Sequence, residues 1–353
     1  MAFGVLESIS SLFRHLRTST RNTSPTSLDS KPVLSAAKTP SKREKLETTA
    51  PSTTTPSPPS SSSLRDRMPK DAWDSHMHIL DPHYPLAAQA AYTPPRALLP
   101  AARALHGTLG ITKTVLVQPS IYGTDNACLL DALRALGPDR AAGVVAFEPG
   151  EVPSSTRREW HALGVRGVRV NLASVGKDAT GPELEKLLRG YAVECAPLGW
   201  SVQVYLPMRM IELLEPIVPK LTAAGVRICI DHMGHPSLHE MEGRDPYNMR
   251  GFQSLVNLLH QGNTYVKLSA PYRFLDSNPE DVAPLEPVAR ELLRVAGMNR
   301  VVFATDWPHT RFDGLDIKSW VEAVLEWCDG DEGLVERVFR GNAEELWGDK
   351  SIQ

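Results

Sequence analysis

Residues 71–353 repeat one pattern, in which a short β-branched run is followed by a polar residue and then by a helix-like stretch. The pattern predicts eight strands, at 72–78, 113–118, 142–148, 165–172, 201–206, 227–232, 264–269 and 300–306. Helix-like segments lie between them, among them 126–137, 183–198, 209–224, 248–261 and 283–297. Strands that alternate with helices indicate a parallel sheet, and eight units in about 280 residues favour a closed (β/α)8 TIM barrel. An open, doubly wound α/β sheet is the alternative, but no glycine-rich phosphate loop follows the first strand.

The first part of the chain has a different composition. Residues 48–63 are Ser, Thr or Pro at every position except Ala50. Such a stretch has almost no apolar surface to bury, so we expect it to be disordered. This places the domain boundary close to Pro69, with a disordered tail over 1–68 and the barrel over 69–353.

Residues 1–22 could form a short amphipathic helix. They contain Arg14, Arg17 and Arg21, and Glu7 is the only acidic residue before position 29. This composition is typical of a mitochondrial transit peptide. An untargeted tail of a cytoplasmic protein is the alternative, and the residues do not decide between the two.

Charge and hydropathy limit the partners of the protein. Residues 1–70 carry 11 Lys/Arg and 5 Asp/Glu of the totals of 38 and 41, so residues 71–353 carry 27 and 36 and a net charge near −9. An acidic main domain argues against nucleic-acid binding. No apolar run reaches the roughly 20 residues that cross a bilayer. We therefore expect a small-molecule substrate, and the oligomeric state stays open.

The four cysteines, Cys128, Cys195, Cys229 and Cys328, lie far apart in the chain and form no CxxC pair. Three of them fall in helix-like segments and Cys229 in an apolar strand. This distribution is typical of reduced, buried thiols.

The active site of a TIM barrel lies where the strands end. Polar side chains occupy these positions at His76, His78, Gln118, Arg169, Asn171, Tyr205, Asp231, His232, Lys267, Ser269 and Asp306. The ends of the strands therefore predict a site rich in ionisable groups.

The candidates for catalysis are His76, His78, His232 and Asp306. Because side chains alternate along a strand, His76 and His78 point the same way. Asp306 ends an apolar strand, and a buried carboxylate needs partners. A structural ion pair or a helix cap is the alternative for Asp306, and a turn-stabilising role is the alternative for His232.

Two arginines are candidates for anion recognition. Arg169 projects from the fourth strand and Arg273 lies in the loop PYRF after the seventh, and the planar guanidinium matches a carboxylate. Arg166 is expected to be a surface or interlayer residue. Asp231 either holds a neighbouring histidine in one tautomer or caps its loop.

The motifs DSHMH (74–78), YTP (92–94), GVRGVRVN (164–171), DHMGHP (231–236) and TDWPH (305–309) resemble the amidohydrolase superfamily. Within it, the chain is similar to the branch of 2-pyrone-4,6-dicarboxylate lactonase and related sugar-lactone and muconolactone hydrolases. The resemblance covers residues 72–347. It implies a hydrolase that opens a lactone, a cyclic ester, of a small and carboxylated organic acid.

The resemblance also implies roles for individual residues. Asp306 would be the general base that activates water, with His76, His78 and His232 around the lactone carbonyl. The implied substrate-binding residues are Arg169, Arg273, Gln118, Tyr205, His235 and Tyr92.

Binuclear members of the superfamily use a carboxylated lysine on the fourth strand and a histidine on the fifth. Here the fourth strand offers Arg169 and Asn171, and the fifth offers Gln203 and Tyr205, which argues against a two-metal site. Lactonases of the resembling branch work without a metal, so we expect no cofactor. The alternative is one divalent metal such as zinc, held by His76, His78, His232 and Asp306.

The chain departs from the lactonase pattern at His235, where the family has an arginine. A basic residue expected after the fourth strand is also missing, unless Lys177 replaces it. Fewer fixed positive charges predict a substrate with one carboxylate or none. An ordinary histidine at position 235 would gain charge as the pH falls towards about 6.

Two other functions stay open at this point. A metal-dependent decarboxylase of the same superfamily would need a histidine on the fifth strand. A non-catalytic barrel would have no need for several buried ionisable groups. The sequence identifies neither the substrate nor its pathway.

Overall fold

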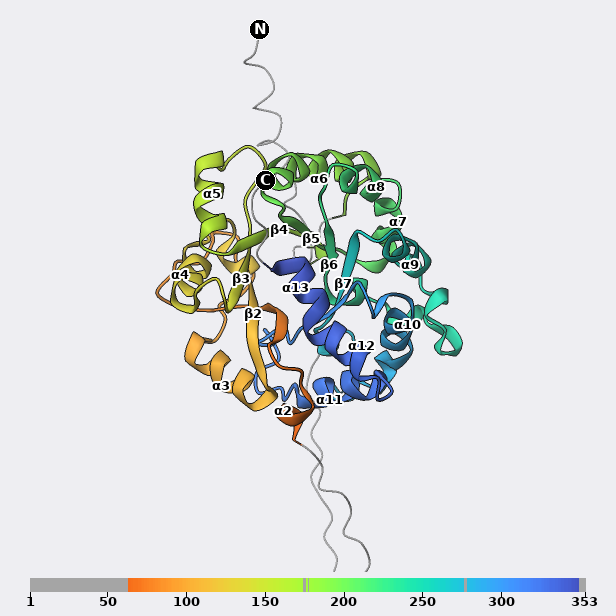
Figure 1. Cartoon of the computed structure of the whole chain (residues 1–353). Coiled ribbons are helices and arrows are strands. Elements are labelled where there is room, and N and C mark those ends of the chain that lie inside the picture. Colours follow the sequence, from red (N-terminus) through yellow and green to blue (C-terminus); the bar gives the residue numbers. More distant parts are fainter. Residues whose placement is uncertain (1–62, 174–175, 177, 276–277, 349–353) are drawn as a thin grey trace, which may run out of the picture. The chain divides into compact units, whose positions relative to one another are not determined.

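The computed structural model describes residues 63–173, 176, 178–275 and 278–348 (Figure 1). Eight parallel strands form one sheet in chain order. They are β1 (Ala72–Met77), β2 (Ile111–Val117), β3 (Ala141–Val145), β4 (Val165–Asn171), β5 (Ser201–Tyr205), β6 (Ile228–Ile230), β7 (Thr264–Leu268) and β8 (Val301–Phe303). The predicted TIM barrel is confirmed.

The barrel is closed by backbone hydrogen bonds between β1 and the residues that follow β8. The amide of Asp306 donates to the carbonyl of His76 at 2.9 Å, and the amide of His78 donates to the carbonyl of Trp307 at 2.8 Å. Met77 and Trp307 form the parallel bridge between them. The first and last units of the chain therefore meet at three of the predicted catalytic residues, His76, His78 and Asp306.

Several strands are shorter than the sequence predicts, because the chain turns sharply at their ends. The prediction for β6 was 227–232 and for β8 300–306, but both have three residues. His232 has φ 52° and Asp306 has φ 58°. This left-handed conformation does not continue a strand, and it turns the two side chains into the end of the barrel.

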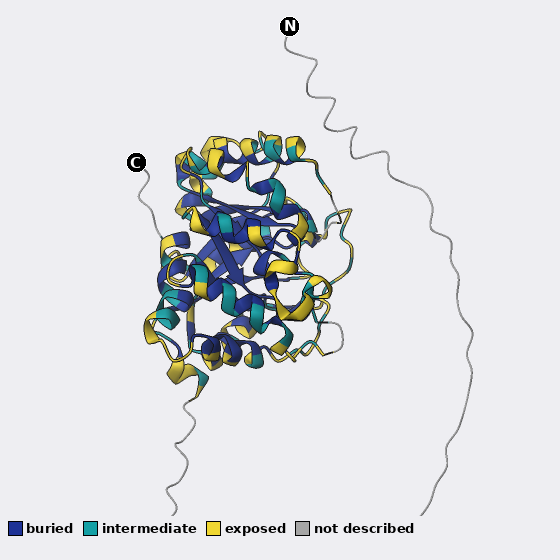
Figure 2. Ribbon diagram, turned by 90° about the vertical axis from the view of Figure 1, so that its right-hand side faces the viewer, coloured by how far each residue is buried: buried dark blue, intermediate teal, exposed yellow. Residues whose placement is uncertain are grey.

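Helices surround the sheet, and their inward faces are buried (Figure 2). They are α3 (Leu99–Leu109), α4 (Ala127–Leu136), α5 (Ser154–Ala162), α6 (Gly181–Cys195), α7 (Ile211–Leu214), α8 (Val218–Thr222), α9 (Phe252–His260), α10 (Glu286–Ala296), α11 (Lys318–Trp327), α12 (Glu332–Glu336) and α13 (Asn342–Trp347). The helix predicted over 209–224 is divided into α7 and α8, with Pro216 between them. Proline has no amide hydrogen to donate to the preceding turn.

Helix α13 lies across the end of the barrel at which the strands begin, which we call the base (Figure 1). Its residues Leu346 and Trp347 pack with inner strand residues such as Trp73, Val115 and Val302 in one apolar cluster. A cavity of about 310 Å³ at this end includes Lys113 and Glu344 in its lining, but none of the predicted site residues. The base is therefore a region of packed apolar side chains, and the predicted site is not there.

The described part of the chain begins with a short helix, α2 (Leu64–Arg67), inside the segment assigned to the tail. Met68, which follows α2, is buried against the barrel. Residues 1–62, and with them the possible transit peptide, lie outside the described residues. The domain boundary and the location in the cell stay predictions.

The four cysteines are buried and free, as predicted. Among the described residues, no helix is both long enough and apolar enough to span a membrane.

Candidate active site

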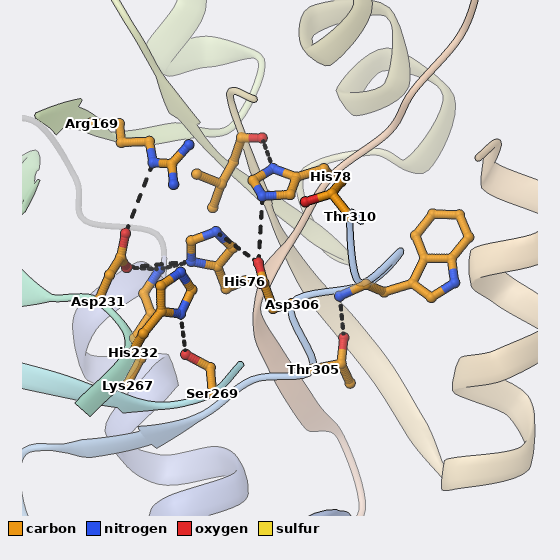
Figure 3. A network of polar contacts seen from close by, with 12 residues as sticks. His76, His78, Arg169, Asp231, His232, Lys267, Ser269, Thr305, Asp306 and Thr310 are labelled. Atoms are coloured by element: carbon orange, nitrogen blue, oxygen red, sulfur yellow. Dashed lines mark hydrogen bonds and ion pairs between the residues drawn. The ribbon is translucent and has the colours of Figure 1, made fainter. Parts of the chain in front are cut away.

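The structure brings the four predicted catalytic residues together at the opposite end of the barrel, which we call the mouth (Figure 3). Oδ1 of Asp306 lies 3.5 Å from Nε2 of His76 and 3.5 Å from Nε2 of His78. The ring of His232 lies 4.8 Å from that of His76, centroid to centroid. All four side chains are buried.

The two carboxylate oxygens of Asp306 have different surroundings. Oδ2 accepts hydrogen bonds from the hydroxyl of Tyr272 at 2.5 Å and from Nε and Nη2 of Arg273 at 3.0 and 2.9 Å. Oδ1 is buried and makes no hydrogen bond to any residue that the structure describes. Burial alone would raise the pKa of Asp306, but the charge of Arg273 holds this pKa well below its usual range. The carboxylate is therefore charged, and one oxygen is free to accept a proton.

Two of the histidines around Asp306 are held in place by contacts of their Nδ1 atoms. Nδ1 of His78 lies 2.8 Å from the carbonyl of Val117, and Nδ1 of His232 lies 2.7 Å from the hydroxyl of Ser269. Burial lowers the pKa of His232 to about 3 and, with the charge of Lys267, lowers the pKa of His76 well below its usual value. His76 and His232 are thus neutral imidazoles at neutral pH.

A second layer of buried groups supports His76 from below. Lys267 on β7 donates to Oε1 of Gln203 at 2.7 Å and lies 3.3 Å from Oδ1 of Asp231. Nδ1 of His76 lies 3.2 Å from Nζ of Lys267 and 3.3 Å from Oδ1 of Asp231. Burial opposes the charge on Asp231, but the charge of Lys267 holds the pKa of this carboxyl well below its usual value. The sequence predicted Lys267 at a strand end but no role for it.

Asp74 braces the junction between β1 and β8. Its carboxylate accepts from the amide of Thr305 at 2.9 Å, from the Thr305 hydroxyl, and from the amide of His76 at 3.1 Å. Nε2 of His106 lies 3.0 Å from the second oxygen. Asp74 and Tyr272 were not predicted as site residues. Two features of the sequence could have indicated them. Asp74 is an acidic residue inside the buried first strand, and Tyr272 is next to Arg273.

The two arginines predicted to hold substrate are both engaged by the protein. Arg273 faces Asp306, and its Nη2 also lies 3.2 Å from the hydroxyl of Thr310. Arg169 donates through Nη1 to the carbonyl of Gln118 at 3.0 Å, and its Nε lies 3.9 Å from Asp231. Their roles in substrate binding stay predictions.

Gln118 directs its amide nitrogen away from the site, to the carbonyls of Gly123 and Asp125 at 3.2 and 2.7 Å. It therefore holds the loop after β2. Its Oε1 is buried without a hydrogen bond within the described part of the chain. The contact of Gln118 with substrate also stays a prediction.

The predicted residues Tyr205 and His235 form a pair beside His232. The Tyr205 hydroxyl lies 2.8 Å from Nδ1 of His235, and its ring packs edge-on against His232. Burial and the charge of Arg273 lower the pKa of His235 to about 4. The expectation that His235 gains charge near pH 6 is therefore wrong. Tyr92 is further out, under the guanidinium of Arg311 at 4.7 Å from the ring centroid.

Three residues of the site could hold a metal ion. Ligand atoms of His76, His232 and Asp306 lie within 4.8 Å of one another. His78 is not part of this group. Lys177, suggested as a substitute for a missing basic residue, lies outside the described residues.

A closed eight-stranded barrel with buried histidines and a carboxylate at its mouth defines a TIM-barrel enzyme. Residues 73–348 match the family model described as amidohydrolase, and the chain belongs to this family. It is 32% identical to 4-sulfomuconolactone hydrolase of Hydrogenophaga intermedia, over 81% of this chain and 91% of that protein. It is 31% identical to 2-pyrone-4,6-dicarboxylate hydrolase of Comamonas testosteroni, over 69% and 78% of the two chains.

A solved structure supports the same relationship. The putative 2-pyrone-4,6-dicarboxylic acid hydrolase of Pseudomonas putida superimposes with a TM-score of 0.67 at 31% identity, covering 80% of this chain and 98% of that chain. The resemblance inferred from the motifs is confirmed.

Proposed function

We propose that the protein opens the ring of a lactone of a small organic acid, using a water molecule activated by Asp306. The observation that carries the proposal is the asymmetry of this carboxylate. One oxygen is held by Tyr272 and Arg273, and the other faces His76 and His78 and has no hydrogen bond among the described residues. The two relatives named as lactone hydrolases support the same reaction.

The reaction follows from these positions. Oδ1 of Asp306 takes a proton from water while the water oxygen attacks the lactone carbonyl carbon. Imidazole N–H groups at the mouth stabilise the oxyanion that forms. The C–O bond of the ring then breaks, the leaving oxygen takes the proton back from Asp306, and the product is a hydroxy acid.

The low pKa of Asp306 has two effects on this reaction. It keeps the carboxylate charged at neutral pH, but it also makes the carboxylate a weak base, and a general base works best with a pKa near the working pH. Much of the rate acceleration must therefore come from oxyanion stabilisation in a site from which water is excluded.

We further propose that the site works without a metal. Its two buried carboxylates are already neutralised, Asp306 by Arg273 at 2.9 Å and Asp231 by Lys267 at 3.3 Å. A divalent ion among His76, His232 and Asp306 would be repelled by both cations. The group does not fit a metal well, and a single zinc ion is the alternative.

The substrate is proposed to carry one carboxylate or none. Where the lactonase pattern has an arginine, this chain has a neutral His235 that is paired with Tyr205. Arg273 is engaged by Asp306. The mouth therefore offers few free positive charges for a second carboxylate.

The other candidate functions find less support. A metal-dependent decarboxylase needs a histidine on the fifth strand, and β5 carries Gln203 and Tyr205 towards the site. A non-catalytic barrel leaves the buried charges of the mouth without a purpose.

The test is a hydrolysis screen of lactones on protein freed of metal with a chelator, together with metal analysis. Asp306→Asn should lower kcat by about 10²–10⁴-fold, the usual contribution of a general base. Asp313→Asn, at an exposed carboxylate in the loop after β8, is the matched control and should leave kcat unchanged. Activity that returns only with added zinc would contradict the metal-free site. Near-normal turnover of Asp306→Asn would remove Asp306 from the mechanism.

A further inference from the structure

Lys267 is the most deeply buried cation of the site, and its contacts account for its charge. The side chain has no exposed surface. Its ammonium group meets Gln203, Asp231 and His76 at 2.7, 3.3 and 3.2 Å, and the ring of Trp347 lies below it at 5.2 Å. A buried charge persists only with such partners. The chain thus keeps a lysine directly behind a predicted catalytic histidine.

The contact with His76 determines which ring nitrogen carries the hydrogen. Nδ1 of His76 has two polar neighbours, Lys267 and Asp231. The ammonium can only donate, and it makes a hydrogen bond to Nδ1. Oδ1 of Asp231 lies 3.3 Å from Nδ1, but it makes no hydrogen bond to any of the described residues. Because a neutral imidazole has one N–H, the hydrogen of His76 is on Nε2.

His78, which directly follows β1, has the opposite arrangement. Its Nδ1 lies 2.8 Å from the carbonyl of Val117, which can only accept. Nδ1 of His78 therefore carries a hydrogen that it donates to this carbonyl. Both Nε2 atoms lie 3.5 Å from the same oxygen of Asp306. Nδ1 is thus an acceptor in His76 and a donor in His78.

We propose that Lys267 is a positioning residue that fixes His76 with its hydrogen on Nε2, so that His76 faces the reacting groups as a hydrogen-bond donor and not as a metal ligand. Nε2 of His76 is buried without a hydrogen-bond partner among the described residues, so its N–H is available to a carbonyl oxygen. A histidine that ligates a metal through Nε2 needs a lone pair there, and its Nδ1–H usually donates to a carboxylate. Asp231 is placed to accept such a bond once Lys267 is removed.

The effect on turnover rests on the proposed function, whereas the tautomer does not. The first measurement is therefore NMR of the unmodified protein with ¹⁵N-labelled imidazoles, with the His76 signals assigned by His76→Gln. We expect Nδ1 without hydrogen and Nε2 with hydrogen. The reverse pattern in the unmodified protein overturns the proposal, whether or not any lactone is hydrolysed and whether or not a variant folds.

The second measurement compares two variants of the same buried network. Lys267→Met removes the donor to His76, and Gln203→Leu removes another partner of Lys267 but leaves that donor in place. We expect the hydrogen of His76 to move to Nδ1 in Lys267→Met only. The same tautomer in both variants overturns the proposal.

Two further readouts separate positioning from general support of the fold. Loss of one oxyanion donor lowers kcat by about 10²–10³-fold, and we expect such a fall in Lys267→Met with little change in KM, against a much smaller fall in Gln203→Leu. Zinc should bind at least about 10-fold more tightly to Lys267→Met than to Gln203→Leu. Effects of this size are seen when the groups that hydrogen-bond to metal ligands are changed. Equal kcat and equal zinc affinity in the two variants would contradict the role assigned to Lys267.

Discussion

The base of the barrel is filled by apolar side chains such as Trp73, Val115 and Leu346, whereas the mouth contains Asp231, Lys267 and Asp306 without exposed surface. Among the described residues, both ends have buried polar atoms without a hydrogen bond. At the base they include the indole nitrogen of Trp347, and at the mouth they include Nε2 of His76 and one carboxylate oxygen each of Asp231 and Asp306. The base therefore contributes stability and the mouth contributes reactivity.

The backbone conformation also differs between the base and the mouth. Among the described residues other than glycine, ten have positive φ, and all but Asp71 and Asp329 lie in the loops that follow β6, β7 and β8. Such conformations cost on the order of 1–3 kcal/mol each and gather at functional sites. Packing at the base offsets the strain at the mouth.

The largest expected effect tests the base. Leu346→Ala removes a fully buried side chain from the cluster under α13. We expect the free energy of unfolding to fall by about 2–5 kcal/mol, while kcat of the folded protein changes little. Chemical denaturation and steady-state kinetics measure the two. Val193→Ala, at a side chain that is 75% exposed, is the control and should stay within about 0.5 kcal/mol. A large loss of kcat in Leu346→Ala would mean that α13 also positions the site.

A second effect tests the mouth through pH. Burial lowers the pKa of His309 to about 4. Above pH ~6.5 the group is neutral in both states, and below it only the unfolded chain binds the proton, so stability falls as the pH drops towards 4. The loss is on the order of 3 kcal/mol for this group. Urea unfolding of the wild type and of His309→Asn should show a shallower pH dependence in the variant. Equal slopes would show that His309 does not contribute.

A third effect distinguishes two roles for Arg273. If it mainly holds Asp306, Arg273→Met removes the largest cause that lowers the pKa of that carboxyl. The pKa then rises, and activity is lost at a higher pH on the acidic side. The lost charge-assisted hydrogen bonds are worth about 1.5–3 kcal/mol, or about 10–150-fold in kcat/KM. The pH profile of kcat is the measurement. An unchanged profile with a raised KM for carboxylated lactones alone would instead support the predicted substrate anchor.

The smallest effect concerns substrate charge. A neutral His235 predicts that a monocarboxylate lactone is preferred to its dicarboxylate analogue. Because the pKa of His235 is about 4, this preference should change by less than about twofold between pH 8 and 6. The ratio of kcat/KM for the two lactones at both pH values measures it. A dicarboxylate that is preferred at both values would contradict the proposal drawn from His235.

The sequence predicted the barrel because each strand is a local pattern of β-branched residues. It also predicted His76, His78, His232 and Asp306 as one cluster, because the ends of parallel strands converge. The contacts of Lys267 and Arg273 could not be predicted in this way. Which neighbour a long side chain meets depends on its direction and on residues from distant strands. The pKa of His235 was mispredicted for a related reason, since burial is a tertiary property.

The closing hydrogen bonds between the first and last units join the backbone of His76 to Asp306 and that of His78 to Trp307. The amide protons of Asp306 and His78 therefore report the opening of this junction in hydrogen-exchange experiments. Any fluctuation that separates the two units also moves Asp306, the proposed general base, away from His76 and His78. We therefore expect heat inactivation to follow the rate at which these two amides exchange.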